Sequence, residues 1–188
     1  QARITLTEAV TTFATIGGAD TITLGRGINV VIGGIGGLDE FGAVLGDTIT
    51  TAGAQNIEGA SIILGDAGRI LTATEDTRSK FHVLLVETLF PTIGDVDFIT
   101  TTNGSDIILG GLGEDVIDAG NGDNLIIGDG GKIVGADIYP AADQTRPITL
   151  ISIDAVASAD GGNDTIDTGT GRDIILGGAG DDTITANN

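Results

Sequence analysis

Residues 169–185 read GTGRDIILGGAGDDTIT, a stretch in which glycine-rich turns alternate with short runs of isoleucine, leucine and threonine. Asp173 and Asp182 each close one turn, nine residues apart, and an isoleucine follows each of them two places later. Side chains alternate between the two faces of a strand, so a three-residue strand turns its middle side chain away from its neighbours. The stretch therefore predicts two short strands, each with one inward isoleucine, joined by glycine turns.

The nine-residue step continues along most of the chain. The polar residues that close the turns are Asp20, Asn29, Asp47, Ser61, Asp97, Asp106, Asp115, Asn124, Asp164, Asp173 and Asp182. Insertions near residues 37–45 and 52–60 keep the step in phase, and two places after each turn stands isoleucine or, once, Val31. Strands this short must stack on copies of themselves to be stable. We expect an all-β fold, a parallel β-roll or β-solenoid in which two half-turns make one coil with two parallel sheets.

A longer repeat lies above the nine-residue one. The segment IILGDAGRI (62–70) reappears as LIIGDGGKI (125–133), and an irregular, strand-rich stretch follows each copy. This predicts a single elongated repeat domain over residues 1–188, built from units of about 3–71, 80–133 and 148–188. The last unit stops after three half-turns, which is the pattern expected of a segment cut from a longer chain.

The charge balance restricts the possible partners. The chain has 188 residues, with 27 acidic against 8 basic side chains and a net charge of −19. A compact fold with this charge repels itself unless cations neutralise part of it. We expect no nucleic-acid partner because no basic patch could neutralise phosphates, and no membrane insertion because no apolar run approaches 18 residues. Cysteine is absent, so neither disulfides nor thiolate metal sites can stabilise the fold.

The segments GGLGEDVID (110–118) and GGAGDDTIT (177–185) resemble the calcium-binding nonapeptide of the RTX, or haemolysin-type, family. Close variants are TGTGRDIIL (168–176) and AGNGDNLII (119–127), and the similar repeats cover about half of the chain. The resemblance implies a calcium-folded β-roll from a bacterial protein that is secreted or surface-bound, with type I-like export. It further implies a non-catalytic structural segment of a large adhesin-like or toxin-like protein.

Calcium prefers six to eight oxygen ligands at about 2.3–2.6 Å, from carboxylates and backbone carbonyls. Glycines allow a turn to aim its carbonyls inward, and the closing residue adds a side-chain oxygen. The predicted calcium-site residues are Asp20, Asp47, Asp97, Asp106, Asp115, Asn124, Asp164, Asp173, Asp182, Gly104, Gly111, Gly113, Gly122, Gly162, Gly171, Gly178 and Gly180. Several ions are expected, each held between two stacked turns.

Stacked turns should bring residues eighteen apart together. The expected pairs are Asp97 with Asp115, Asp106 with Asn124, and Asp164 with Asp182, and, across insertions, Asp115 with Asp164, Asp20 with Asp47, and Asp173 with Asn124. Asp173 and Asp182 should lie on opposite edges and share no metal. Asn29 and Ser61 replace aspartate on one edge, so a site between them should be weak or empty, and Asp95 stands where a glycine is expected.

The residues that flank each inward isoleucine alternate in character from one half-turn to the next. They are mostly threonine on one side of the roll, as in Thr21 and Thr23, and apolar on the other, as in Ile107 and Leu109. One sheet should therefore be apolar on both faces, which is a liability if it is exposed. We expect the strands at 81–86 and 148–153, with residues 4–6, to fold back and bury it, including Ile174 and Leu176; a covering surface from another chain is the alternative.

No catalytic motif is present: the chain has no GxSxG, HExxH or Walker A sequence. We therefore expect no enzymatic activity, and we expect His82, in the apolar run FHVLLV, at an outward or edge position of a sheet. Two alternatives remain open, an ice-binding solenoid that uses the Thr-x-Thr face and a calcium-bound accessory module of an extracellular enzyme. The threonine rows are interrupted by Phe98, Asp118 and Asp167. Besides the neighbouring repeats of the parent chain, a glycan or protein ligand is possible.

Overall fold

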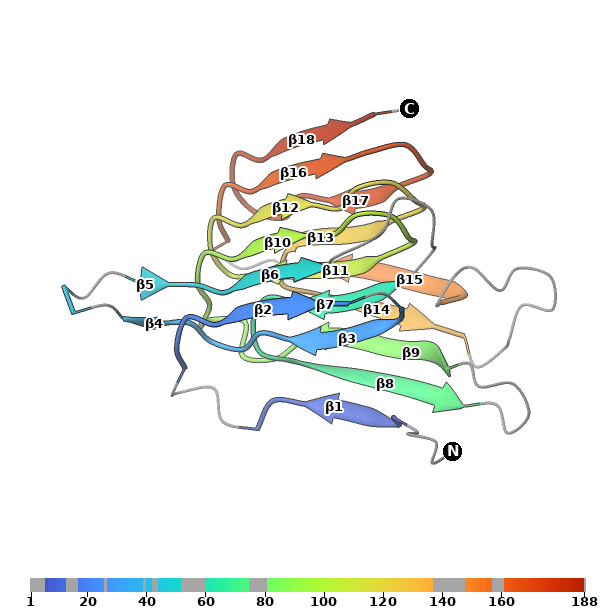
Figure 1. Ribbon diagram of the computed structural model, residues 1–188, viewed down its shortest axis with the longest axis horizontal. Helices are drawn as coiled ribbons and strands as arrows, with labels where there is room; N and C mark the ends of the chain where they lie inside the picture. Colours follow the sequence, from blue (N-terminus) through green and yellow to red (C-terminus); the bar gives the residue numbers. More distant parts are fainter. Residues whose placement is uncertain are drawn as a thin grey trace.

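The computed structural model describes residues 6–12, 17–25, 27–38, 40–41, 44–51, 60–74, 81–136, 148–156 and 161–187. Within these ranges all regular secondary structure is β-strand, arranged in one six-stranded, two five-stranded and one two-stranded sheet (Figure 1). The all-β prediction is confirmed, and the two large parallel sheets are consistent with a β-roll. Among the described residues no helix could span a membrane.

Two parallel sheets form the body of the molecule. The polar sheet contains β2 (Thr21–Leu24), β6 (Thr48–Thr51), β10 (Phe98–Thr100), β12 (Val116–Asp118), β16 (Thr165–Thr168) and β18 (Thr183–Ala186). The apolar sheet contains β3 (Asn29–Ile32), β7 (Ser61–Leu64), β11 (Ile107–Gly111), β13 (Leu125–Asp129) and β17 (Ile174–Leu176). Each polar-sheet strand except β18 is followed in sequence by a strand of the apolar sheet, and we call such a pair a layer.

The predicted inward residues form two columns in register. In the polar sheet the column is Ile22, Ile49, Ile99, Ile117, Ile166 and Ile184. In the apolar sheet it is Val31, Ile63, Ile108, Ile126 and Ile175. Most of these residues pack in one hydrophobic cluster, with Ile49, Ile63, Ile108 and Ile126 fully buried. The nine-residue step therefore predicted the register of both sheets correctly.

The outer face of the polar sheet carries two rows of side chains that are mostly exposed. One row runs through Thr21, Thr48, Phe98, Val116, Thr165 and Thr183, and the other through Thr23, Thr50, Thr100, Asp118, Asp167 and Thr185. Phe98 and Val116 are adjacent in register, and so are Asp118 and Asp167. Neither row is an unbroken threonine ladder, so the geometry does not favour the ice-binding alternative.

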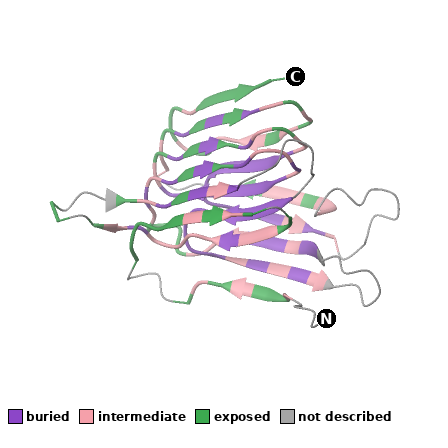
Figure 2. Cartoon of the chain, in the orientation of Figure 1, coloured by how far each residue is buried: buried purple, intermediate pink, exposed green. Residues whose placement is uncertain are grey.

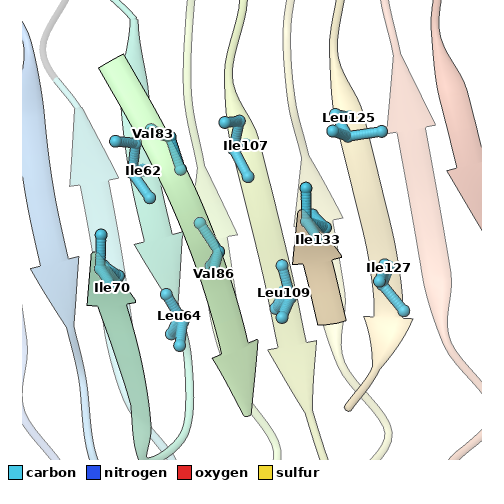
Figure 3. Close-up of a cluster of buried hydrophobic side chains, with 10 residues drawn as sticks. All are labelled: Ile62, Leu64, Ile70, Val83, Val86, Ile107, Leu109, Leu125, Ile127 and Ile133. Atoms are coloured by element: carbon cyan, nitrogen blue, oxygen red, sulfur yellow. The ribbon is translucent and has the colours of Figure 1, made fainter. Parts of the chain in front are cut away.

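A third sheet, the cover sheet, is antiparallel throughout. Its strands, in spatial order, are β1 (Glu8–Val10), β8 (Gly68–Thr74), β9 (Phe81–Thr88), β14 (Gly131–Gly135) and β15 (Leu150–Ala155). It contributes Ile70, Val83, Val86 and Ile133 to a second hydrophobic cluster, whose other buried members come from the apolar sheet (Figure 3). The middle strands of the apolar sheet, β7, β11 and β13, are thus buried on both faces, as the sequence predicted.

The sequence analysis predicted that the cover strands bury the outer face of the apolar sheet. The prediction is confirmed in the middle of the sheet but not at its last strand. Ile107 and Leu109 are each 1% exposed, whereas Ile174 is 45% exposed and Leu176 is partly buried. The reason is position, because β17 is an edge strand with a neighbour on one side only. Figure 2 shows β11 and β13 of the apolar sheet buried, whereas β18, the last strand of the polar sheet, is exposed.

Two details of the cover sheet differ from expectation. Its first described strand is Glu8–Val10, and residues 4 and 5 of the expected 4–6 strand lie outside the described residues. Strands β8 and β14 belong to it although the sequence analysis assigned no cover role to their segments. His82 lies in β9, a central strand, and is 7% exposed, so it is a buried residue and does not occupy an edge position.

The insertion expected near residues 37–45 contains a small hairpin of β4 (Gly37–Leu38) and β5 (Val44–Leu45), which projects from the body (Figure 1). The other expected insertion, near residues 52–60, falls almost wholly outside the described residues.

Candidate metal-binding turns

The turns that lead into the polar sheet form what we call the first edge, and each ends in an aspartate. In spatial order these are Asp20, Asp47, Asp97, Asp115, Asp164 and Asp182. The backbone N–H of each donates to Oδ1 of the next, over 2.7, 2.6, 2.8, 2.8 and 3.0 Å. The first edge is therefore a continuous ladder of carboxylates, which brings together every pair expected there. It also joins Asp47 to Asp97, a contact over 50 residues that the nine-residue step does not predict.

The turns that lead into the apolar sheet form the second edge, which carries fewer charges. Its closing residues are Asn29, Ser61, Asp106, Asn124 and Asp173. Oδ1 of Asp106 accepts from the N–H of Ser61, Asn124 Oδ1 accepts from Asp106, and Asp173 Oδ1 accepts from Asn124, over 2.6, 3.0 and 2.9 Å. Both expected pairs on this edge are in contact. Asp173 and Asp182 lie on different ladders, as predicted.

The second carboxylate oxygen of the ladder residues is buried and has no hydrogen-bond donor. This holds for Oδ2 of Asp47, Asp97, Asp106, Asp115 and Asp164. On the first edge these oxygens lie against the glycine that begins the same turn: a Cβ built on Gly110 would overlap Asp115 Oδ2 and the carbonyl oxygen of Gly128 in the next layer. The same arrangement recurs at Gly33, Gly65 and Gly128. Each turn thus presents a carboxylate oxygen and a backbone carbonyl to one small space that only glycine leaves open.

Burial makes these carboxylates hard to ionise without a cation. It raises the pKa of Asp97 to about 7 and that of Asp164 to about 7, although the N–H bond from the previous layer lowers both values. These values include the repulsion of neighbouring carboxylates, which raises both. The pKa of Asp115 lies well above its usual range for the same reasons. A bound cation would supply the missing partner for each Oδ2 and favour the charged form.

The donor set fits calcium better than a transition metal. All the available donors in the turns are oxygens, from aspartates and backbone carbonyls, and these are the ligands that calcium prefers. Within the described ranges no three His, Cys, Asp or Glu side chains form a group that could hold a metal. An ion at these turns must therefore take part of its coordination from the backbone.

The predicted glycines occupy the expected places in the turns. Seven of the eight have positive φ: Gly104, Gly111, Gly113, Gly122, Gly171, Gly178 and Gly180. Gly162 is the exception, but a Cβ on it would overlap the carbonyl oxygen of Gly113 in the layer before. Glycine is therefore required at position 162 by the close stacking of two turns and not by the backbone dihedral angle.

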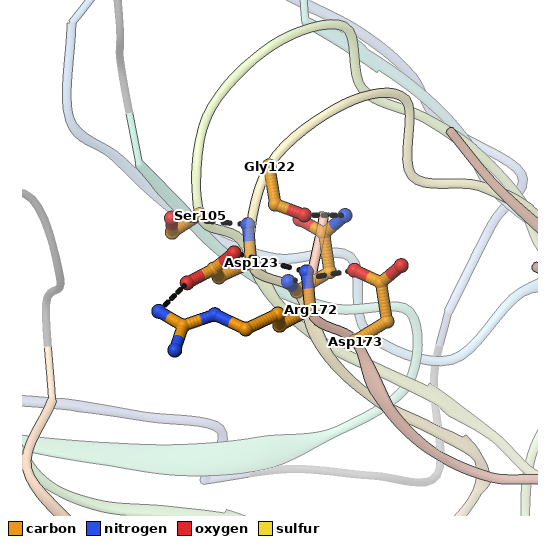
Figure 4. Close-up of polar contacts among 6 residues, drawn as sticks. Ser105, Gly122, Asp123, Arg172 and Asp173 are labelled. Atoms are coloured by element: carbon orange, nitrogen blue, oxygen red, sulfur yellow. Dashed lines mark hydrogen bonds and ion pairs between the residues drawn. The ribbon is translucent and has the colours of Figure 1, made fainter. Parts of the chain in front are cut away.

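The second edge has polar contacts that the sequence analysis did not identify. Arg172 pairs with Asp123 at 2.9 Å, and the Arg172 N–H donates to the same carboxylate at 2.9 Å (Figure 4). The Asp123 N–H in turn donates to Ser105 Oγ at 3.3 Å. The three residues stand at the same place in successive turns, directly before the closing residue. A side-chain cation therefore supports this edge where Asn124 has replaced aspartate.

Two first-edge turns are split by cover strands. Asp97 Oδ2 lies over Gly65 just as Asp115 Oδ2 lies over Gly110, so residues 65–66 and 94–97 together form one turn, the first split turn. Asp164 Oδ2 lies over Gly128 in the same way, so residues 128–129 and 161–164 form the second split turn. The sequence does mark the two split turns: a glycine–aspartate dipeptide follows IIL (62–64) and LII (125–127). At the same place an unsplit turn has two glycines.

The aspartate at the second place of each split turn connects it to the next layer. Asp66 Oδ2 accepts from the Leu112 N–H at 2.6 Å, and Asp129 Oδ2 accepts from the Ala179 N–H at 2.5 Å. Asp129 Oδ1 also accepts from the Gly162 N–H at 3.1 Å, which closes its own split turn. Sequence analysis assigned neither aspartate a role.

Stacked glycine–aspartate turns between parallel sheets define a class of protein, the calcium-binding repeat proteins. Comparison with known families agrees: the model described as RTX calcium-binding nonapeptide repeat (4 copies) matches residues 97–132 and 158–188. Residues 97–132 and 158–188 are therefore similar to the RTX calcium-binding nonapeptide repeat. No curated protein and no solved structure matched the chain. The first-edge ladder extends beyond the matched segments to Asp20 and Asp47.

Proposed function

We propose that the protein is a calcium-folded, non-catalytic structural β-roll segment. The observation that carries the proposal is the set of buried Oδ2 atoms on the first edge, each without a donor and beside a backbone carbonyl. The ions would be held by Asp20, Asp47, Asp97, Asp115, Asp164 and Asp182 with the carbonyls of their turns, and on the second edge by Asp106, Asn124 and Asp173.

Calcium binding would supply much of the folding free energy. The unfolded chain has no preformed cages, so the free energy of binding appears as free energy of folding. The net charge of −19 adds to this dependence, because stacked carboxylates repel one another until cations neutralise them. A chain of this kind is much less stable where calcium is scarce than where it is plentiful. That behaviour suits a bacterial protein exported by a type I-like system, at the cell surface or outside the cell.

The units at about 3–71, 80–133 and 148–188 would act as successive modules of one elongated domain. Strand pairing supports this division: β1 pairs with β8, and β9 pairs with β14, so the first and last strands of the first two units lie side by side. In such a segment the acidic residues of the edges have a structural role, since ladder bonds occupy one oxygen of every closing aspartate except Asp20. The parent protein would be a large adhesin-like or toxin-like protein.

A thermal melt followed by circular dichroism tests the proposal. The protein is dialysed against EDTA and compared with samples in millimolar calcium and in millimolar magnesium. We expect a large rise in melting temperature with calcium and a small one with magnesium, because magnesium demands octahedral geometry and dehydrates reluctantly. An unchanged melting temperature on adding calcium would contradict the proposal.

A further inference from the structure

Two asparagine–glycine dipeptides occupy the same place in successive turns of the second edge. They are Asn103–Gly104 and Asn121–Gly122, and the sequence contains no third. A parallel bridge joins Asn103 to Asn121, so the two dipeptides are stacked on one another. Neither asparagine closes a turn, and the carboxylate ladders therefore do not account for them.

Asparagine before glycine is prone to spontaneous deamidation. The backbone nitrogen of the glycine attacks Cγ of the asparagine side chain and forms an N–Cγ bond. The Cγ–Nδ2 bond breaks, and the departing nitrogen takes up the proton of the glycine N–H and leaves as ammonia. Water then opens the cyclic imide at either carbonyl and gives aspartate or isoaspartate. Glycine favours the reaction because it has no side chain to hinder the approach.

The folded turns occupy both of the nitrogens that would attack. The Gly104 N–H donates to the Asn121 carbonyl at 2.8 Å, and the Gly122 N–H donates to the Thr170 carbonyl at 2.9 Å. A nitrogen must lose its proton to attack, and a hydrogen-bonded N–H is therefore a poor nucleophile. Each bond joins one layer to the next, so the reaction requires the layers to separate at this edge.

The side chain of Asn121 is also held from two layers, although the residue is exposed. Its Nδ2 donates to Asn103 Oδ1 at 3.0 Å. Its Oδ1 accepts from the backbone N–H of Thr170 at 2.9 Å and from the Thr170 hydroxyl at 3.0 Å. The amide that would be lost therefore takes part in the same stacking as the nitrogen that would attack it.

We propose that Asn103 and Asn121 are deamidation sites which the stacked turns protect, and that the chain is modified there when the second edge opens. The inference rests on the proposed function in one respect, the control of opening by calcium. Asp106 and Asn124, which would hold an ion on this edge, lie three places after the two asparagines in the same turns. Loss of calcium would therefore loosen the turns that protect them.

The modification would prevent the turns from stacking again. The Asn121 N–H donates to the Thr102 carbonyl at 2.8 Å, and the Asn121 carbonyl accepts from Gly104. Isoaspartate adds a backbone atom between these two groups, so both bonds are not made in the existing register. Aspartate keeps the register but replaces the Nδ2 donor with an acceptor beside Asn103 Oδ1. A chain that opens without calcium would thus be marked permanently.

Peptide mapping by mass spectrometry tests the sites on the full chain. The protein is incubated at mildly alkaline pH in calcium, in EDTA and in guanidinium, and fragment ions locate the converted residues. We expect conversion at Asn103 and Asn121 to be at least about tenfold slower in calcium than in guanidinium, because local opening must come first. The rate in EDTA should lie between the two. Asn124, which precedes a leucine, is the internal control and should stay unconverted.

A pair of variants tests the protection of one site directly. Thr170→Val removes the hydroxyl that donates to Asn121 and keeps both backbone bonds, so in calcium we expect conversion at Asn121 to be about threefold faster. Conversion at Asn103 should not change, and Thr170→Ser, which keeps a hydroxyl, should match the wild type. Equal rates in the folded protein and in guanidinium would overturn this inference alone. Equal rates in calcium and in EDTA would overturn the control by calcium, and an unchanged melting temperature beside them would overturn the proposed function as well.

Discussion

The backbone N–H of Asp115 donates a 2.8 Å hydrogen bond to Oδ1 of Asp164, although 49 residues separate the two in sequence. The excursion through β14 and β15 lies between them. Asp97 and Asp115 make the same bond at the same length over 18 residues, with no excursion between them. The ladder geometry is therefore set by adjacency of layers rather than by distance along the chain, and cover strands can be inserted into a turn without breaking it.

The calcium-free protein should lose stability as the pH rises from about 4 to about 7. Asp97 and Asp164 have a pKa of about 7 in the folded state against an ordinary 3.8, because burial disfavours the charged form. The folded state then binds protons more tightly than the unfolded state, so this contribution is complete at low pH and is lost towards pH 7. Melting temperatures of the dialysed protein across this range measure it.

Saturating calcium should weaken or reverse this pH trend, because the ion binds the deprotonated carboxylates. A calcium-free melting temperature that rises steadily between pH 4 and pH 7 would show that these carboxylates are not held in a desolvated site.

Replacing Gly110 with alanine should destabilise the calcium-bound protein by about 1–3 kcal/mol or more. A Cβ at this position would overlap Asp115 Oδ2 and the backbone carbonyl of Gly128, and the backbone cannot move without disturbing the next layer. Gly25→Ala is the matched control, since a Cβ there meets no atom within 4 Å. Chemical denaturation in calcium gives both values, and equal losses would mean that the close approach at Gly110 is unimportant.

The cover sheet should contribute to stability through its contact with the apolar sheet. Leu109 is 1% exposed and belongs to the cluster shared by the two sheets, so Leu109→Ala should cost about 2–5 kcal/mol. Ile151 lies in cover strand β15 but is 64% exposed, so Ile151→Ala should change stability by less than about 0.5 kcal/mol. Denaturant titrations of the two variants provide the comparison. Similar losses would argue that the apolar sheet gains little from its cover.

The strand register was predictable because it follows from one local signal. An isoleucine two places after each turn fixes which side chain points inward, and stacking then sets Ile99 beside Ile117 and Ile108 beside Ile126. The need for a cover was also predictable, since Ile107 and Leu109 flank an inward residue and are themselves apolar. Which strands provide the cover was only partly predictable, because β8 and β14 continue directly from repeat strands without a turn of the expected kind.

The split turns were harder to predict because their two halves are far apart in sequence. Gly65 and Asp66 complete a turn whose remaining residues begin at Gly94, and no nine-residue window contains both parts. The contact of Asp47 with Asp97 escaped for the same reason, since it depends on the first excursion of the cover sheet. The Arg172–Asp123 pair was missed because the nine-residue pattern was defined by the residue that closes each turn. Both partners stand one place before that residue.

The second edge carries fewer charges than the first and should hold one further calcium ion when its charges are made to match. Asn124 accepts from Asp106 and donates to Asp173 in the ladder, and Arg172 supplies a cation beside it through Asp123. The double variant Asn124→Asp with Arg172→Ser adds a carboxylate and removes the competing cation, so we expect one more ion per chain in equilibrium dialysis and a lower melting temperature in EDTA. Arg172→Ser alone should bind the wild-type number and lose at most about 1 kcal/mol, because the arginine side chain is 81% exposed. An unchanged ion count in a folded double variant would mean that charge does not limit calcium binding on this edge.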